Sequence, residues 1–269
     1  MNIFKTIREK YPNEMILFLI FLALFVIMSI LSPDVFFSGA TISNMMYQMP
    51  EFGLMALAMM AVILTGGINL SIITASTLSG ILAALVMRTE WGQNNTALAT
   101  VIGVVIIIGA SMLTGVVNGY FIGVLGIVAM VLTLATQMIF EGLGLVITSG
   151  KSIPIVQEEF LGIGSASIGP IPVPMLVYVG AIILAYFMLE RSRWGRNIYM
   201  IGDNEVATRF SGVNTKKVIL LTYVFSGLMY GLSSMLITSR LCSAKTDYGS
   251  SYLMQAVTAV VMGGTDIMG

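Results

Sequence analysis

The chain has 269 residues, of which 57% are hydrophobic and only 10% are charged. A soluble domain carries about 25% charged residues, so this composition excludes an ordinary soluble protein and indicates a membrane protein. The formal net charge is zero, which gives no reason to expect a nucleic-acid partner. The chain has no histidine, which excludes a His-based zinc site and a Ser-His protease. We therefore expect neither a metal nor a cofactor.

The first apolar segment follows the basic residues Lys5, Arg8 and Lys10. This order is typical of a signal peptide, but no small-residue cleavage site follows the apolar run. We therefore expect an uncleaved first membrane helix, with cleavage as the less favoured alternative.

Long apolar runs predict about eight membrane-spanning helices, because about 20 apolar residues cross the hydrocarbon core. They lie near residues 15–32, 43–65, 68–87, 97–118, 121–148, 173–190, 218–239 and 252–268. Basic residues concentrate in cytoplasmic loops, and the 191–217 segment is rich in them. An even number of the predicted helices separates this segment from the N-terminus, so we place both in the cytoplasm. The sequence predicts an all-α, multi-pass helical bundle that forms a single transmembrane domain over 1–269.

Polar residues inside the apolar runs are candidates for a solute path, because burying them in a membrane is costly. With the glycine pair that exposes backbone groups beside them, the candidates are Gly66, Gly67, Asn69, Ser71, Asn118, Gln137, Glu141 and Gln255. Asn69 is the strongest of them, because the glycine pair frees backbone groups beside it, and its amide suits a neutral, hydroxyl-rich solute. The alternative is that these residues only join helices through hydrogen bonds. The scarcity of intramembrane charge argues against an ion pump.

The 191–217 segment contains a second pattern of interest. Asp203 or Asn204 can cap a short helix, and Gly212 can end it, which leaves about two turns over 205–211. Such a helix is suited to a groove on a partner protein. The alternative, which composition alone favours, is a solvated loop whose positive charges only set the topology.

No GxxxxGK[ST] phosphate-binding loop occurs in the chain, so it does not hydrolyse ATP in the usual way. The carboxylates Glu141 and Asp266 each stand alone in apolar surroundings. We therefore expect a transport subunit and not an enzyme.

Four segments match the motifs of a known family in the right order, from about residue 40 onward. They are GGINLS (66–71), GVVNGYFIG (115–123), GRNIYMIGDNEVATRFSG (195–212) and YGSSYLMQAVTAVVMGGTDIMG (248–269). In these motifs the chain resembles the permease subunits of sugar-type ABC importers, the branch that carries ribose, other simple sugars and autoinducer-2. The chain departs from the family pattern at Asn69, Glu141, Thr208 and Leu253, which leaves the solute open.

The resemblance implies a permease that moves a small polar solute, in the first place a monosaccharide, across the bacterial inner membrane. The implied partners are an ABC ATPase subunit, an extracytoplasmic solute-binding protein, and a second permease copy or paralogue within the lipid bilayer. The family fold has about ten helical spans, so we expect a C-terminally shortened member or a fragment. The residues implied in ATPase coupling are Gly202, Asp203, Asn204, Glu205, Val206, Ala207, Arg209, Phe210, Ser211 and Gly212.

Two alternatives remain at the level of the sequence. The first is a secondary carrier or channel for a small neutral solute that works without an ATPase. The second, weaker alternative is a membrane scaffold subunit with no transport path. Co-purification of a nucleotide-binding subunit would separate the importer from both.

Overall fold

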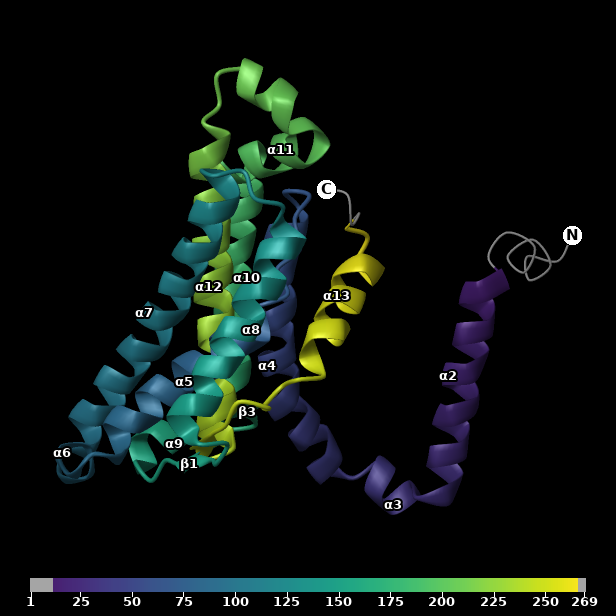
Figure 1. Ribbon diagram of the computed structural model, residues 1–269. Helices are drawn as coiled ribbons and strands as arrows, with labels where there is room; N and C mark the ends of the chain where they lie inside the picture. The colour runs from purple at the N-terminus through teal and green to yellow at the C-terminus, as the bar shows by residue number, and fades with distance from the viewer. Residues whose placement is uncertain (1–11, 266–269) are drawn as a thin grey trace, which may run out of the picture. The chain divides into compact units, whose positions relative to one another are not determined.

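The computed structural model of the protein describes residues 12–265, with side chains from Leu19 onward (Figure 1). It divides into two units, the first ending at Met46 and the second starting at Tyr47. The first unit contains α2 (Pro12–Leu31) and α3 (Pro33–Phe36), and α4 (Gly39–Ile63) runs across the boundary. Within the first unit, the rings of Phe25 and Phe36 pack edge to face with centroids 5.2 Å apart. The basic residues of the predicted N-terminal segment lie outside the described residues.

The second unit is built almost entirely of helices, as the sequence predicts. After α4 come α5 (Ile72–Arg88), α6 (Glu90–Asn94), α7 (Thr96–Gly123), α8 (Ala129–Thr148), α9 (Glu158–Ser165), α10 (Val173–Tyr186), the π-helical η1 (Phe187–Arg191), α11 (Arg193–Phe210), α12 (Thr215–Arg240) and α13 (Tyr252–Met262). Two short antiparallel ladders pair β1 (Ile153–Pro154) with β4 (Ser243–Ala244) and β2 (Ser167–Ile168) with β3 (Ile171–Pro172). Figure 1 shows α11 at one end of this bundle and α6, α9 and β1 at the other.

Helix α12 forms the centre of the second unit, and its Tyr223 and Tyr230 side chains are fully buried. It packs closely on α7, where Gly115, Gly119 and Gly123 recur at four-residue intervals. A Cβ atom on Gly119 would lie 2.9 Å from the Cα atom of Leu220. Small residues at this spacing allow two helix backbones to approach, which is a common mode of helix association in membranes.

Serine hydroxyl groups join α5, α7 and α12 inside the bundle. Ser111 Oγ donates to Ser79 Oγ at 2.9 Å, and Ser79 Oγ donates to Ser234 Oγ at 3.2 Å. Ser234 Oγ donates in turn to the carbonyl oxygen of Ser76 at 2.6 Å. All four serines are buried, so these bonds satisfy groups that have no access to water.

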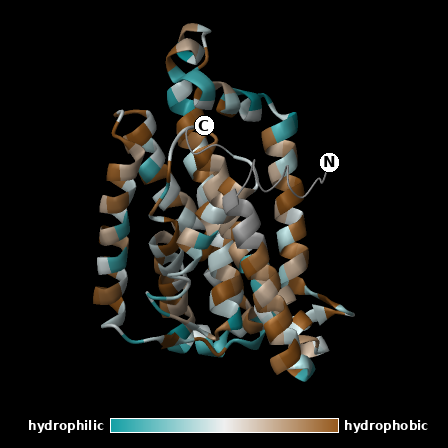
Figure 2. Ribbon diagram, turned by 90° about the vertical axis from the view of Figure 1, so that its right-hand side faces the viewer, coloured by the Kyte–Doolittle hydropathy of each residue, from teal (hydrophilic) through white to brown (hydrophobic). Residues whose placement is uncertain are grey.

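Five helices among the described residues are long and apolar enough to cross a membrane by length and composition. They are Gly39–Ile63, Thr96–Gly123, Ala129–Thr148, Val173–Arg191 and Thr215–Arg240. Shorter apolar helices cover Leu19–Leu31, Ile72–Arg88 and Tyr252–Met262. The prediction of an all-α membrane bundle is confirmed, whereas the count of about eight spans is not. In Figure 2 the hydrophilic residues of the second unit gather at its two ends.

Several predicted helices have different bounds in the structure. The run at 121–148 becomes a helix only at Ala129, because α7 continues to Gly123 and the chain then turns at Gly126, where φ is +74°. The run at 68–87 begins as a helix only at Ile72. The run at 252–268 ends at Met262, and its last residues lie outside the described part of the chain.

Candidate functional site

The glycine pair in the TGGINLS segment ends α4. Gly66 has a φ of +74°, a conformation that glycine adopts without strain. Its N–H donates to the carbonyl of Ile63 at 2.8 Å, and the N–H of Gly67 donates to the carbonyl of Val62 at 3.3 Å. These bonds satisfy two of the last carbonyl groups of α4, as glycine C-caps commonly do. The pair therefore lets the chain turn sharply between α4 and α5.

A buried amide cluster follows this turn. Asn69 Oδ1 accepts from the N–H of Ser71 at 3.1 Å and from its Oγ at 2.8 Å. On α7, Asn118 Nδ2 donates to Ser71 Oγ at 2.8 Å. All three side chains are 0% exposed, so the structure brings together three of the residues predicted for the solute path. The turn made by Asn69 and Ser71 also explains why α5 begins later than predicted.

This cluster keeps unused hydrogen-bonding capacity. Asn69 Nδ2 and Asn118 Oδ1 have no partner among the described residues, and neither has the hydroxyl of Tyr223 on α12. A Cβ atom on Gly67 would lie 3.1 Å from the Tyr223 hydroxyl, so this group lies beside the glycine turn. A buried polar group without a partner costs about 1–3 kcal/mol. The position therefore favours binding of a hydroxyl group or a water molecule.

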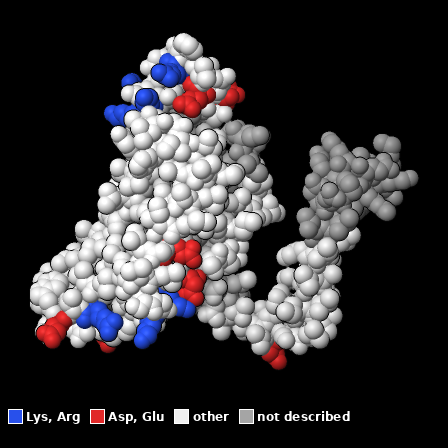
Figure 3. Space-filling view, in the orientation of Figure 1, with Lys and Arg blue, Asp and Glu red and all other residues white. Residues whose placement is uncertain are grey.

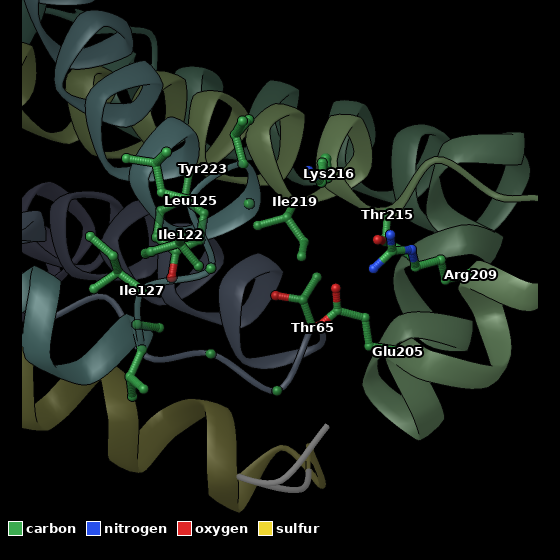
Figure 4. A pocket seen from close by; sticks show the side chains of 17 residues that line it. Thr65, Ile122, Leu125, Ile127, Glu205, Arg209, Thr215, Lys216, Ile219 and Tyr223 are labelled. Atoms are coloured by element: carbon green, nitrogen blue, oxygen red, sulfur yellow. The ribbon is translucent and has the colours of Figure 1, made fainter.

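A cavity of about 460 Å³ lies next to the glycine turn, at the α11 end of the bundle (Figure 4). Its walls come from the end of α4, the α7–α8 connection, α11 and the start of α12. Tyr223 and Gly67 both line it. Small-molecule sites have volumes of about 300–1,000 Å³, so the cavity has the size of such a site.

The cavity has a charged side and an apolar side. Glu205, Arg209 and Lys216 line it, and no ion pair involves them among the side chains described from Leu19 onward. In Figure 4 Glu205 and Arg209 lie on one side, whereas Tyr223 lies on the other among the apolar residues Ile122 and Ile127. The cavity thus combines a charged wall with an apolar wall.

Helix α11 contains the short helix that the sequence predicts within 205–211. Its backbone leaves the helical region at Asn204, where φ is −162° and ψ is 102°. Asn204 Oδ1 accepts from the N–H of Ala207 at 2.9 Å, which makes Asn204 the N-cap. Gly212 follows the helix with a φ of +84°. The predicted cap and stop are confirmed, although the segment before the cap is also helical, which the prediction of a loop missed.

The short helix presents two apolar side chains to the outside. Val206 is 64% exposed and Phe210 is 88% exposed, and their i, i+4 spacing places them on one face. Thr208 on the opposite face is buried, and its hydroxyl donates to the carbonyl groups of Met200 at 2.6 Å and Asn204 at 2.8 Å. This threonine therefore ties the short helix to the first part of α11.

The remaining residues predicted for the solute path lie elsewhere. Gln137 on α8 is half-buried, and Glu141 on the same helix is exposed. Gln255 on α13 is exposed as well. No hydrogen bond joins these three to the amide cluster within the described part of the chain.

A sequence model of one family matches residues 41–269, which is most of the chain. The family is described as the branched-chain amino acid transport system permease component. The chain belongs to this permease family. Both the helical bundle and the motif order agree with that membership.

Individual relatives of this permease transport sugars, according to their names. The ribose import permease protein RbsC of Haemophilus influenzae is 34% identical over 256 residues, which cover 94% of this chain and 77% of the relative. RbsC of Bacillus subtilis is 36% identical over 254 residues, covering 93% and 76%. The D-allose transport system permease protein AlsC of Escherichia coli is 31% identical over 261 residues, covering 97% and 77%. No solved structure gives a significant match. The resemblance to sugar-type importer permeases is confirmed.

The sequence reasoning missed one charged group in the interior of the permease. Glu51 on α4 is 1% exposed, and its carboxylate accepts two hydrogen bonds from Arg240 at the end of α12. Arg240 Nε donates to Oε1 at 2.5 Å, and Nη2 donates to Oε2 at 2.8 Å. Two signals point to this pair: a carboxylate directly after Pro50 in an apolar run, and an arginine at the end of another. Their partnership could not be read from the sequence, because 189 positions separate them.

Proposed function

We propose that this permease is the membrane subunit of an importer that moves a small polar solute, in the first place a monosaccharide, using ATP hydrolysed by a separate subunit. The observation that carries the proposal is the α11 end of the bundle. There a capped helix with two exposed apolar residues stands beside the cavity of about 460 Å³. The names of the ribose and allose relatives support the choice of solute.

The proposed path begins at the amide cluster. A sugar hydroxyl both donates and accepts hydrogen bonds, so it can pair with Asn69 Nδ2, Asn118 Oδ1 and the Tyr223 hydroxyl, which lack other partners among the described residues. Glu141 and Gln255 are exposed on this chain. We keep them as candidates for the solute path, on a surface that would face a second copy or paralogue of the permease.

The proposed coupling element is the short helix of α11, from Asn204 to Gly212. Its role is to enter a groove on the ATPase subunit with Val206 and Phe210 as apolar anchors. The helix adjoins the cavity through Glu205 and Arg209, so motion of the ATPase would reach the cavity wall directly.

The proposal also fixes the remaining partners and the orientation. A solute-binding protein would deliver the solute on the outer side of the bacterial inner membrane, where α9 lies. The α11 end and the N-terminus would face the cytoplasm, because the basic residues of 191–217 favour that side.

Replacing Phe210 by Ala tests the coupling element. We expect normal insertion but at least about 2 kcal/mol weaker ATPase binding, roughly 30-fold in Kd, because buried aromatic anchors dominate interfaces. Co-purification and ATP-driven uptake of ribose in proteoliposomes would both measure the loss. The charge reversal Arg209→Glu should weaken association as well.

The matched control is Ile168→Ala, which truncates a 67% exposed apolar side chain at the α9 end. It should leave ATPase association unchanged, as should a charge change at Glu158 in the same loop region. If both Phe210→Ala and Arg209→Glu assemble and transport like the wild type, the coupling role is contradicted. The positive charges of α11 would then serve only to set the membrane topology. A carrier that needs no ATPase would then be the better account.

A further inference from the structure

The carboxylate of Glu51 is a buried charged group that lies outside the proposed path. Both of its oxygen atoms are used: Oε1 and Oε2 pair with the Arg240 guanidinium, and Oε2 also accepts from the Tyr252 hydroxyl at 3.2 Å. The carbonyl oxygen of Glu51 accepts from Ser233 Oγ at 2.7 Å. The group therefore links three helices, α4, α12 and α13.

The links are unequal in strength. The guanidinium fork binds Glu51 at two points with charge on both partners, which is the strongest arrangement for such a pair. Helix α12 is also fixed at this end, because Ser239 Oγ donates to the carbonyl of Phe160 in α9 at 2.6 Å. Tyr252 contributes one longer bond and an edge-to-face contact with Phe52, with ring centroids 6.4 Å apart. Helix α13 is thus the element held least firmly.

The surroundings of α13 also indicate an element that can separate from the bundle. A groove of about 270 Å³ lies between α13, α4 and α10, with Ala56 on the α4 side and Val260 on the α13 side. The loop before α13 turns at Gly249, where φ is +72°. Buried ion pairs are weak contributors to stability, and their best-supported use is to specify one arrangement or to act as a switch.

We propose that Glu51, Arg240 and Tyr252 form a latch that holds α13 over this groove, and that release of Tyr252 is a step in solute passage. The Glu51–Arg240 pair stays closed and positions the acceptor for Tyr252. The three are positioning residues, because none of them lines the cavity beside α11. The second half of the proposal rests on the proposed transport function.

The latch itself is tested without any transport assay. In a Cys242→Ser background, Ala56→Cys places a thiol in the groove beneath α13. The rate at which N-ethylmaleimide labels it in purified protein reports how often α13 separates. Tyr252→Phe keeps the ring against Phe52 but removes the hydroxyl bond, so labelling should accelerate roughly two- to tenfold. The matched control is Tyr248→Phe, which removes a similar 2.7 Å bond to Ser243 in the same loop and should leave the rate unchanged.

The role in passage is tested in proteoliposomes that contain the ATPase and the solute-binding protein. Tyr252→Phe should increase ATP-independent efflux of radiolabelled ribose by a similar factor, whereas Tyr248→Phe should not. Equal labelling rates in Tyr252→Phe and the parent would overturn the latch, and so would a lower melting temperature with unchanged labelling. Faster labelling with unchanged efflux would overturn its role in passage. A wild-type protein that shows no ATP-driven uptake would instead contradict the proposed function, and the labelling result would still decide the latch.

Discussion

The amide of Asn69 is held at one atom and unpaired at the other. Its Oδ1 accepts two bonds from Ser71, whereas Nδ2 has no partner among the described residues. The bonds to Ser71 use only Oδ1, so Nδ2 is the atom of this amide that can bind a solute in the proposed path. This role remains a prediction.

We expect Asn69→Leu to reduce ribose uptake about two- to tenfold, the effect of one lost hydrogen bond to the solute of about 0.5–1.5 kcal/mol. The measurement is initial uptake into proteoliposomes, with gel filtration to confirm that the variant folds and retains its ATPase. Thr100→Val is the control, because it removes another buried hydroxyl without a partner, on the same helix as Asn118. Unchanged uptake in Asn69→Leu would leave packing as the role of this cluster.

Thr208 shows how a departure from the family pattern acquires a structural role. Thr208 is one of the positions at which the sequence departs from the family pattern, and the hydroxyl of this residue joins the two parts of α11. Gly195 in the same helix is required for a different reason. A Cβ atom there would collide with the carbonyl oxygen of Leu189, so only glycine lets α11 start so close to η1.

At the scale of helices, the contact of α7 with α12 decides the shape of the bundle. Gly115 and Gly119 bring the α7 backbone against residues 220–224 of α12, and Gly227 on α12 makes the reciprocal contact with Ser111. A membrane supplies little hydrophobic driving force between helices, so close van der Waals contact must hold them together.

We expect Gly115→Ala to destabilise the bundle by about 1–3 kcal/mol, because the new methyl group would collide with the carbonyl oxygen of Tyr223. Gly109→Ala on the same helix meets no atom within 4 Å and should be neutral or stabilising by up to about 1 kcal/mol. Thermal unfolding in detergent would measure both. A Gly115→Ala variant as stable as Gly109→Ala would show that the two helices can separate without penalty.

At the scale of the whole molecule, the second unit has two charged ends (Figure 3). The α11 end contains the basic residues Arg191, Arg193, Arg196, Arg209, Lys216 and Lys217, and the other end contains Arg88, Lys151, Arg240 and Lys245. By the positive-inside rule, the excess at the α11 end predicts that this end faces the cytoplasm. This orientation remains a prediction.

Helix α12 allows a direct test of that orientation, because Lys217 and Cys242 lie at its two ends. The helix has 26 residues and is therefore about 39 Å long, enough to cross the bilayer once. Cys242 is exposed and lies beside β1, so it should react with a membrane-impermeant thiol reagent in intact cells. Lys217→Cys in a Cys242→Ser background should be protected. Lys5→Cys should be protected too, whereas Asp34→Cys and Glu158→Cys should react. The reverse pattern at Lys217 and Cys242 would invert the orientation.

Hydropathy and turn chemistry, both local properties, determined much of the fold from the sequence alone. The apolar runs predicted the position of each long apolar helix, although they missed the first part of α11. Asn204 with Gly212 predicted the cap and the stop of the short helix, because a capping bond spans only three residues. The late start of α8 was missed, because Leu125 to Val128 are as apolar as a helix. Only the turn at Gly126 separates them from it.

Tertiary structure alone decided which distant side chains meet. Asn69 and Asn118 are both visible as polar residues in apolar runs. The bonds between Asn69 and Ser71 span two residues and are local, whereas only the packing of α5 on α7 brings Asn118 to Ser71. Glu141 and Gln255 carry the same signal and remain exposed, because the sequence does not say which face of a wholly apolar helix is buried. Glu51 and Arg240 belong to the same class. Their meeting depends on the crossing of α4 and α12, which is fixed by contacts that lie far apart along the chain.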